Sequence, residues 1–260
     1  NGIPRFDKPP LIYWLMGLFY SLPGQEVWDP LGSWSARLPS AISSLLVMLV
    51  LGDTLMRWPH RDEIFPRRTA FVTALVFSLS PLVMVWARVA VSDALLCSTL
   101  GISLIFQWRR YVNPSHHSWT YAWIVLSLAV LTKGPVAIVL MGMILTLFSW
   151  FQRDFSLIWN RLRPVPGLLI TTLISLPWYL LELLYEGKPF WDSFFGYHNF
   201  QRFTSVVNAH QEPWWFFFVI LIVASLPFTP LLISGFLGTF LERTKQFGDQ
   251  KIRPEDSLLG

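Results

Sequence analysis

Long apolar segments recur along this chain and limit what it can fold into. Seven of them can be marked out between polar stretches, and most approach the ~20 residues that a helix needs to cross a lipid bilayer. Only 14% of the 260 residues are charged, whereas an ordinary soluble domain has about 25%. The pattern therefore predicts a polytopic membrane protein. The segments are Leu38–Met56, Thr69–Trp86, Ala94–Trp108, Trp119–Leu131, Gly134–Phe151, Val165–Leu184 and Trp214–Phe240.

A shorter apolar stretch, Leu11–Leu22, precedes these segments and is rich in Trp and Tyr. It is too short to cross the bilayer, and its aromatic side chains favour the interface. We therefore expect a helix that lies along the outer face without crossing. The predicted fold is an all-α, polytopic transmembrane helix bundle with this outer-face juxtamembrane helix. It comprises an outer-face loop and helix at residues 1–37, a core of about seven spanning helices at 38–240, and a cytoplasmic loop or tail at 241–260.

The distribution of Lys and Arg indicates which loops face the cytoplasm. The loops after the first, third and fifth segments, together with the C-terminal stretch, contain 13 of the 20 basic residues. Because basic residues of short loops collect on the cytoplasmic side, Lys133 and the loop expected at Glu182–Pro213 should face outward. The basic residues form no continuous stripe, which argues against a nucleic-acid-binding protein.

This threading brings four polar clusters to the outer side of the membrane. An ionisable group at membrane depth costs about 2.5 to 3.5 kcal/mol, so such groups usually have a partner or a function. Cations suit phosphate, and carboxylates suit a base or a metal ion; the set favours chemistry on a lipid-linked phosphate. The clusters are Asp7 and Lys8 in FDKPPL, Arg88 and Asp93 in WARVAVSDALL, Lys133 in LTKGP, and His198, Arg202 and His210 in HNFQRFTSVVNAHQEPWW.

Several of these residues also have a structural interpretation. Lys8 can extend toward the interface beside Asp7 while the two prolines start a helix. Asp93 can satisfy the free N–H groups at a helix N-terminus, which does not exclude a catalytic role. His198 and His210 can be interface residues beside an aromatic belt.

Lys133 is harder to explain structurally. It lies on the face that positive charge tends to avoid, and Gly134-Pro135 follow it. These two residues break the helix and are expected to expose backbone N–H groups. A broken segment of this kind, together with a cation, can bind an anion.

Six motifs in a fixed order resemble those of integral membrane glycosyltransferases related to aminoarabinose transferase and protein O-mannosyltransferase, which have the C-type glycosyltransferase fold. They are NGIPRFDKPPLIYWL, ARLPSAISSLL, ARVAVSDALL, LAVLTKGPVAIVL, LPWYL and HNFQRF...HQEPWWFF, and they reach from Asn1 to about Phe240. The resemblance implies a multi-pass plasma-membrane enzyme, surrounded by membrane lipids. It would take a sugar from a polyprenyl phosphate and pass it to a lipid, glycan or protein acceptor on the outer face.

The resemblance also implies roles for individual residues. Cations near the carrier phosphate stabilise the charge that develops on it as the sugar leaves, and a carboxylate can serve as base for a hydroxyl acceptor. Asp7 occupies an acidic position before Lys-Pro-Pro where a divalent metal ion can be bound. The predicted catalytic residues are Asp93 and Asp7, with Asp7 also a metal ligand, and the predicted substrate-binding residues are Lys8, Lys133, Arg202, Arg88, His198 and His210.

In such families the catalytic acidic residue is assigned to an Asp-Glu motif upstream of DKPP, and this sequence starts with Asn1, after that position. We therefore expect a piece of a longer protein, inactive alone. Two other functions stay open. One is a lipid-linked sugar transporter or flippase, because intramembrane charges and broken helices also mark transport paths. The other is a non-catalytic scaffold subunit.

Overall fold

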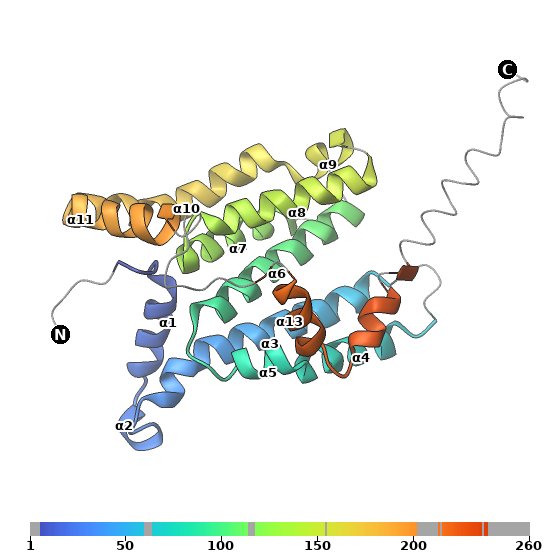
Figure 1. The fold of residues 1–260 in the computed structure, drawn as a ribbon, viewed down its shortest axis with the longest axis horizontal. Helices are drawn as coiled ribbons and strands as arrows, with labels where there is room; N and C mark the ends of the chain where they lie inside the picture. Colours follow the sequence, from blue (N-terminus) through green and yellow to red (C-terminus); the bar gives the residue numbers. More distant parts are fainter. Residues whose placement is uncertain are drawn as a thin grey trace, which may run out of the picture. The chain divides into compact units, whose positions relative to one another are not determined.

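The computed structural model describes residues 6–59, 64–113, 118–153, 155–201, 213, 215–235 and 237–238. Every regular element within these residues is helical, which confirms the all-α prediction (Figure 1). The chain forms two compact units, residues 1–78 with 83–211 and residues 79–82 with 212–260. The helices are α1 (Leu11–Tyr20), α2 (Gln25–Trp28), α3 (Ser33–Arg57), α4 (Pro66–Leu79), α5 (Pro81–Trp86), α6 (Ser92–Val112), α7 (Ser118–Lys133), α8 (Val136–Gln152), α9 (Phe155–Leu162), α10 (Pro164–Glu186), α11 (Lys188–Phe190), the π-helix η1 (Trp191–Gln201) and α13 (Phe216–Ala224).

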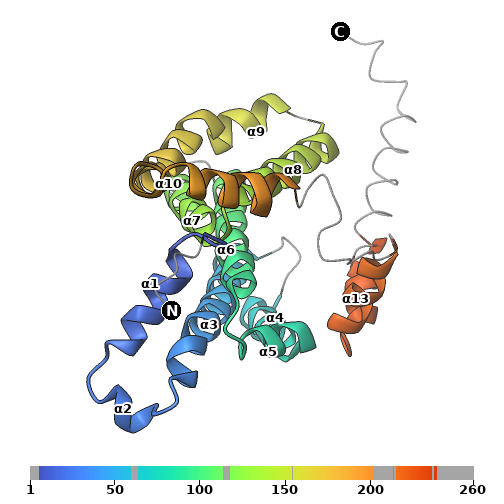
Figure 2. The same ribbon diagram turned by 60° about the vertical axis from the view of Figure 1, so that its left-hand side comes forward.

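The short helix α2 lies at the tip of a turn that connects α1 to α3 (Figure 2). Asp29 closes this turn, because its two carboxylate oxygens accept hydrogen bonds from the N–H groups of Trp34 (3.1 Å) and Ser35 (2.7 Å). Burial opposes ionisation of Asp29, but these backbone donors outweigh it and hold its pKa below the usual range. The carboxylate thus satisfies two N–H groups in the first turn of α3.

Helix α7 packs against α6, α8 and α10 in the first unit and also contacts α1. Nearly all of its described side chains are shielded, and only Tyr121 and Lys133 are exposed. Two hydroxyl groups bond to its backbone from neighbouring helices: Ser103 in α6 donates to the Ala122 carbonyl (2.7 Å), and Thr171 in α10 donates to the Trp123 carbonyl (3.0 Å). Such bonds satisfy polar atoms where water is excluded.

A glycine lets α10 approach α7 closely. A Cβ atom at Gly167 would lie 2.0 Å from the ring of Trp123, far inside van der Waals contact. The indole N–H of Trp123 in turn donates to the Leu162 carbonyl at 3.1 Å. The register between these two helices therefore depends on a residue without a side chain.

Arg109 joins the C-terminal end of α6 to α3. Its Nη2 atom donates to Asp53 Oδ2 and to the Val50 carbonyl, both at 2.9 Å, and its Nε donates to Thr54 Oγ1 at 2.8 Å. Asp53 also pairs with Arg57 at 2.6 Å. The bonds satisfy the guanidinium of a residue that is only 7% exposed.

The chain is a multi-pass membrane helix bundle, as predicted. By length and composition, two helices among the described residues can each cross a membrane, Ser33–Arg57 and Trp159–Glu186. A third span results if Phe216–Ala224 and Thr229–Gly235 are counted together, although they are bent by 112°. Three other apolar helices are shorter, including α1. The number of seven spans and the domain boundaries stay predictions.

Two of the predicted segments are interrupted. The stretch Thr69–Trp86 forms two helices, α4 and α5, with a break before Pro81. The stretch Trp214–Phe240 is divided after α13, close to Pro227. A proline lacks the N–H for the helical hydrogen bond and disfavours helix in the residue before it, and hydropathy alone does not register this effect.

Two other predictions were wrong in extent. Helix α6 is longer than the segment Ala94–Trp108, because it also includes Asp93 in its first turn and Arg109 and Arg110 in its last, which a search for apolar residues leaves out. The expected loop Glu182–Pro213 is helical as far as Gln201, through the end of α10, α11 and η1. Aromatic side chains within it pack together; Phe190 and Phe194, for example, stack with ring centroids 5.5 Å apart.

Candidate active site

Lys133 and Asp93 form an ion pair between the last residue of α7 and the first turn of α6. The helix dipoles favour this arrangement, since a carboxylate suits a helix N-terminus and a cation suits a C-terminus. The two side chains are 43% and 40% exposed, respectively. The pair therefore joins two helix ends and stays accessible to a ligand.

Asp93 does not cap α6 in the way that the structural interpretation expected. The N-cap position is Val91, and no side-chain hydrogen bond caps this end. The Oδ1 atom of Asp93 instead accepts a hydrogen bond from Lys133 Nζ. The geometry favours a role for Asp93 in orienting Lys133.

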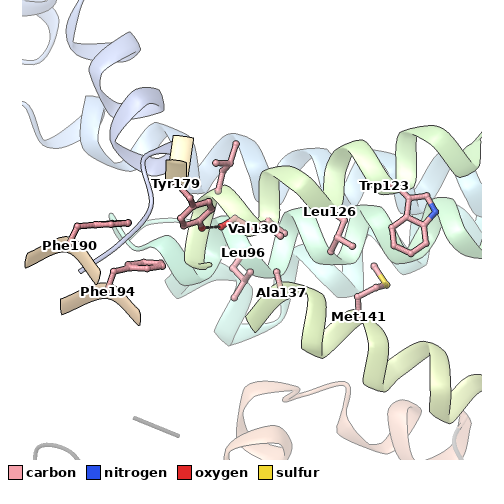
Figure 3. Close-up of a cluster of buried hydrophobic side chains, with 11 residues drawn as sticks. Leu96, Trp123, Leu126, Val130, Ala137, Met141, Tyr179, Phe190 and Phe194 are labelled. Atoms are coloured by element: carbon pink, nitrogen blue, oxygen red, sulfur yellow. Dashed lines mark hydrogen bonds between the residues drawn. The ribbon is translucent and has the colours of Figure 1, made fainter. Parts of the chain in front are cut away.

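The backbone around Val130 fixes where α7 ends and hence where Lys133 lies. The Val130 carbonyl accepts hydrogen bonds from the Gly134 N–H (2.8 Å) and from the Tyr179 hydroxyl (2.9 Å). Figure 3 shows Tyr179 directed toward Val130. Gly134 has a φ of +99°, which glycine adopts without steric cost. The lysine thus extends from a helix end that is bonded both locally and to α10.

The expectation that the Gly-Pro break exposes backbone N–H groups was wrong for four of them, including the Gly134 N–H described above. The Ala137 N–H donates to the Gly134 carbonyl (3.2 Å), and those of Ile138 and Val139 donate to the Pro135 carbonyl (3.0 and 3.3 Å). Their bonds are made within the turn itself. Anion binding here would depend on the lysine side chain rather than on these amides.

The FDKPP segment packs beside α11 before α1 begins. The ring of Phe6 meets that of Phe190 edge to face, with centroids 5.7 Å apart, and Pro9 is fully buried. The N-terminal segment accordingly passes close to Phe190 in Figure 3. Its polar residues, Asp7 and Lys8, are half-buried.

Asp7 and Lys8 do not pair with each other in the part of the chain that the structure describes. Asp7 Oδ1 lies 3.5 Å from the Tyr13 hydroxyl, which donates toward it from α1. Lys8 makes no ion pair or hydrogen bond within the described residues. Its ammonium group is therefore available to an anion.

Of the remaining predicted residues, Arg88 is the one whose side chain the structure describes, and it lies outside this arrangement. Arg88 lies in the connection between α5 and α6, where it lines a separate cavity with Arg37. His198 belongs to η1, but its side chain lies outside the described residues. Arg202 and His210 lie outside them altogether.

Metal binding by Asp7 stays a prediction. Among the described residues, no group of three or more His, Cys, Asp or Glu side chains is placed to bind a metal ion. The carboxylate of Asp7 alone does not fit the ligand number that a divalent cation needs. We therefore derive no chemical step through a metal.

Sequence reasoning missed three residues near these sites. Tyr179 belongs to the quoted motif LPWYL, and Arg37 belongs to ARLPSAISSLL, but neither was given a role. Tyr13 lies in the first apolar stretch, where an aromatic residue suggested only the membrane interface. Their partners are distant in sequence or on a neighbouring element, so pattern alone gave no signal for them.

Comparison with known proteins decides the family. Residues 7–180, well over half of the chain, match the family described as dolichyl-phosphate-mannose-protein mannosyltransferase. The chain belongs to this mannosyltransferase family. The resemblance to membrane glycosyltransferases that the motifs suggested is thereby confirmed.

Two relatives are similar in sequence to this mannosyltransferase-family chain over most of its length. An uncharacterized protein of Aquifex aeolicus is 30% identical over 88% of the chain. The undecaprenyl phosphate-α-4-amino-4-deoxy-L-arabinose arabinosyl transferase of Pseudomonas aeruginosa is 29% identical over 93% of the chain. These matches cover 49% and 42% of the two relatives, so the chain spans about half of their length or less.

The fold of the mannosyltransferase-family chain is similar to a solved structure as well. The crystal structure of ArnT from Cupriavidus metallidurans bound to undecaprenyl phosphate superposes with a TM-score of 0.77 at 29% identity. The match covers 89% of this chain and 40% of that one. The predicted polytopic helical glycosyltransferase fold is thus confirmed.

Proposed function

We propose that this chain forms the phosphate-binding part of a membrane glycosyltransferase site. The complete site would transfer a sugar from a polyprenyl phosphate to a lipid, glycan or protein acceptor on the outer face of the plasma membrane. The observation that carries the proposal is the exposed ion pair of Lys133 and Asp93 at the end of α7 and the start of α6. The family match and the names of the relatives support it.

The geometry suggests how the cations would act. The ammonium group of Lys133 has three N–H donors, and the bond to Asp93 uses one of them, so two are free for phosphate oxygens. Lys8 offers a second ammonium group. Fixed cations in a poorly solvated site would stabilise the phosphate more as its charge grows than before the reaction.

The reaction would be a displacement at the anomeric carbon. An acceptor oxygen forms a bond to this carbon while the bond to the phosphate oxygen breaks, and the electron pair leaves with the phosphate. The acceptor's proton passes to a carboxylate, a role that we propose for Asp93 or Asp7. The leaving phosphate needs no proton of its own.

Position favours an enzyme over the alternative of a transporter. Transporter sites lie near the bilayer midplane between broken helices. Asp93 and Lys133 instead lie at the start of α6 and the end of α7. A site at helix ends is open to one face of the membrane, as transfer to an acceptor there requires. The charge distribution suggests that this face is the outer one.

The proposal is tested with membranes that contain the full-length protein and a polyprenyl phosphate carrying a labelled sugar. Lys133→Met should lower transfer efficiency about ten- to more than a hundredfold, because one charge-assisted hydrogen bond contributes roughly 1.5 to 3 kcal/mol. Lys188→Met is the matched control, since Lys188 is exposed on α11 and outside the site.

Two outcomes would contradict the proposal. Equal transfer by the two lysine variants would show that Lys133 is only structural. Movement of the intact sugar-lipid across the membrane, without release of free polyprenyl phosphate, would indicate a flippase, because transport leaves the sugar-phosphate bond unbroken.

A further inference from the structure

Two arginines, Arg37 and Arg88, line a cavity at the N-terminal end of α3. The cavity has a volume of about 260 Å³ and lies between the start of α3 and the connection from α5 to α6. Neither Asp93 nor Lys133 is among its lining residues, so it is separate from the proposed donor site. The lining residues are Trp34, Arg37, Leu38, Ala41, Ala87 and Arg88.

Neither guanidinium group in this cavity has an anionic partner among the residues that the structure describes. Arg37 and Arg88 are exposed, and within the described part of the chain neither makes a hydrogen bond or an ion pair through its side chain. Arg109, in the same unit, donates to Asp53, to Thr54 and to a backbone carbonyl. Two like charges beside one cavity repel each other. An anion between them would remove this repulsion.

The depth of the cavity indicates which anion it would meet. Trp34 and Arg37 lie in the first two turns of α3, which is long and apolar enough to cross the bilayer. Trp34 is 66% exposed, and Trp side chains collect at the level of the lipid headgroups. The cavity therefore lies at headgroup depth, whichever face of the membrane it is on.

The opposite wall of the cavity is fixed to α3 at the same depth. The Ser40 hydroxyl on α3 donates to the Val91 carbonyl at 3.4 Å, three residues after Arg88. Phosphate groups of lipids are the abundant anions at this depth. A guanidinium matches two phosphate oxygens at once, whereas an ammonium acts as a point charge.

We propose that Arg37 and Arg88 bind the phosphate of an anionic bilayer phospholipid. The volume suits a headgroup and its glycerol, since pockets for whole drug-sized ligands begin at about 300 Å³. Leu38, Ala41 and Ala87 supply apolar contacts for the part of the lipid nearest the phosphate. The acyl chains stay in the bilayer.

The test measures lipids that stay bound when the full-length protein is released from mixed micelles into native mass spectrometry. The probes are phosphatidylglycerol and phosphatidylcholine with the same acyl chains. The wild-type protein should retain one phosphatidylglycerol in preference to phosphatidylcholine. The double variant Arg37→Gln, Arg88→Gln should bind it at least about tenfold more weakly, the factor expected for one lost charge-assisted hydrogen bond.

The matched control is Arg67→Gln, Arg68→Gln. These two arginines are exposed in the first turn of α4 and do not line the cavity, so this variant loses the same charge elsewhere. It should retain the lipid as the wild type does. If both double variants lost phosphatidylglycerol equally, the loss would come from the lower net charge alone, and the proposal would be overturned.

Two further results are decisive. If undecaprenyl phosphate displaces the retained phosphatidylglycerol one for one, the cavity belongs to the carrier lipid and the proposal is overturned. If the glutamine variant does not fold, Arg37→Lys, Arg88→Lys keeps the charge but loses the planar fork. That variant should bind phosphatidylglycerol several-fold more weakly, and unchanged retention would refute the assignment.

Discussion

Tyr179 bonds to the end of the helix that carries Lys133, although it is not itself part of the proposed donor site. Its hydroxyl donates to the Val130 carbonyl, one turn before Lys133. Its ring packs at the same time against Trp178 and Phe194, with centroids 4.8 and 5.7 Å away. A substitution that removes only the hydroxyl group therefore tests the hydrogen bond while it keeps the packing of the ring.

We predict that Tyr179→Phe lowers transfer efficiency several-fold at a cost of about 1 kcal/mol in stability, because one neutral hydrogen bond is lost and the ring is kept. Kinetics with varied donor concentration should show the effect mainly in KM for the donor. The control is Tyr185→Phe on the same helix, where the side chain is 93% exposed. Identical kinetics in the two variants would mean that the bond to Val130 does not position the lysine.

Asp93 should act together with Lys133 rather than independently. Asp93→Asn removes the charge that orients the ammonium group, so we expect a loss of about tenfold or more in transfer efficiency. In the double variant with Lys133→Met the two losses should not add, because both changes disrupt the same pair. The measurement is a double-mutant cycle on the donor reaction. Full additivity would indicate two separate roles.

At the scale of helices, the contact between α7 and α10 depends on Gly167. We predict that Gly167→Ala destabilises the protein by about 1 to 3 kcal/mol, because the new methyl group would overlap the Trp123 ring. Thermal unfolding in detergent measures this change. Gly101→Ala is the control, since no atom lies within 4 Å of a Cβ there and alanine favours helix. A neutral result at Gly167 would show that the helices can separate freely.

The stability of the turn at the start of α3 should depend on pH through the charge of Asp29. The backbone donors that lower the pKa of Asp29 in the folded protein stabilise it when the carboxylate is charged. This contribution is complete above the unfolded pKa of 3.8 and disappears as pH falls below that value toward the lower folded pKa. The difference in melting temperature between the wild type and Asp29→Asn at pH 7 should therefore shrink as the pH falls below 3.8. A constant difference across this range would contradict the assignment.

At the scale of the whole molecule, the charge distribution predicts which loops face outward. In a Cys97→Ser background, an impermeant thiol reagent applied to intact cells should label a cysteine placed at Val27 or Tyr185 and miss one at Ile64. The three positions are 87%, 93% and 79% exposed, so access to the side chain does not limit the reaction. Labelling of Ile64 alone would invert the topology and move the proposed site to the cytoplasmic face.

The helical architecture was predictable from sequence because apolar segments and charged loops are local patterns. The pairing of Asp93 with Lys133 was not, because it depends on how α6 and α7 pack across 40 residues of sequence. Each residue was recognised alone as an expensive charge at membrane depth. Arg37 was given no role from the sequence, since its relation to Arg88 appears only when α3 meets the connection between α5 and α6.

The burial of α7 has a consequence for membranes of different composition. This helix is shorter than a full span, and a lipid-facing helix of that length would strain against a thicker bilayer. Its surroundings are almost entirely other helices, so the acyl chains hardly touch it. Longer fatty acids or cooler growth should therefore act on the outer surfaces of α3 and α10, while the distance between Asp93 and Lys133 stays the same. The geometry of the site would then be insulated from changes in lipid metabolism.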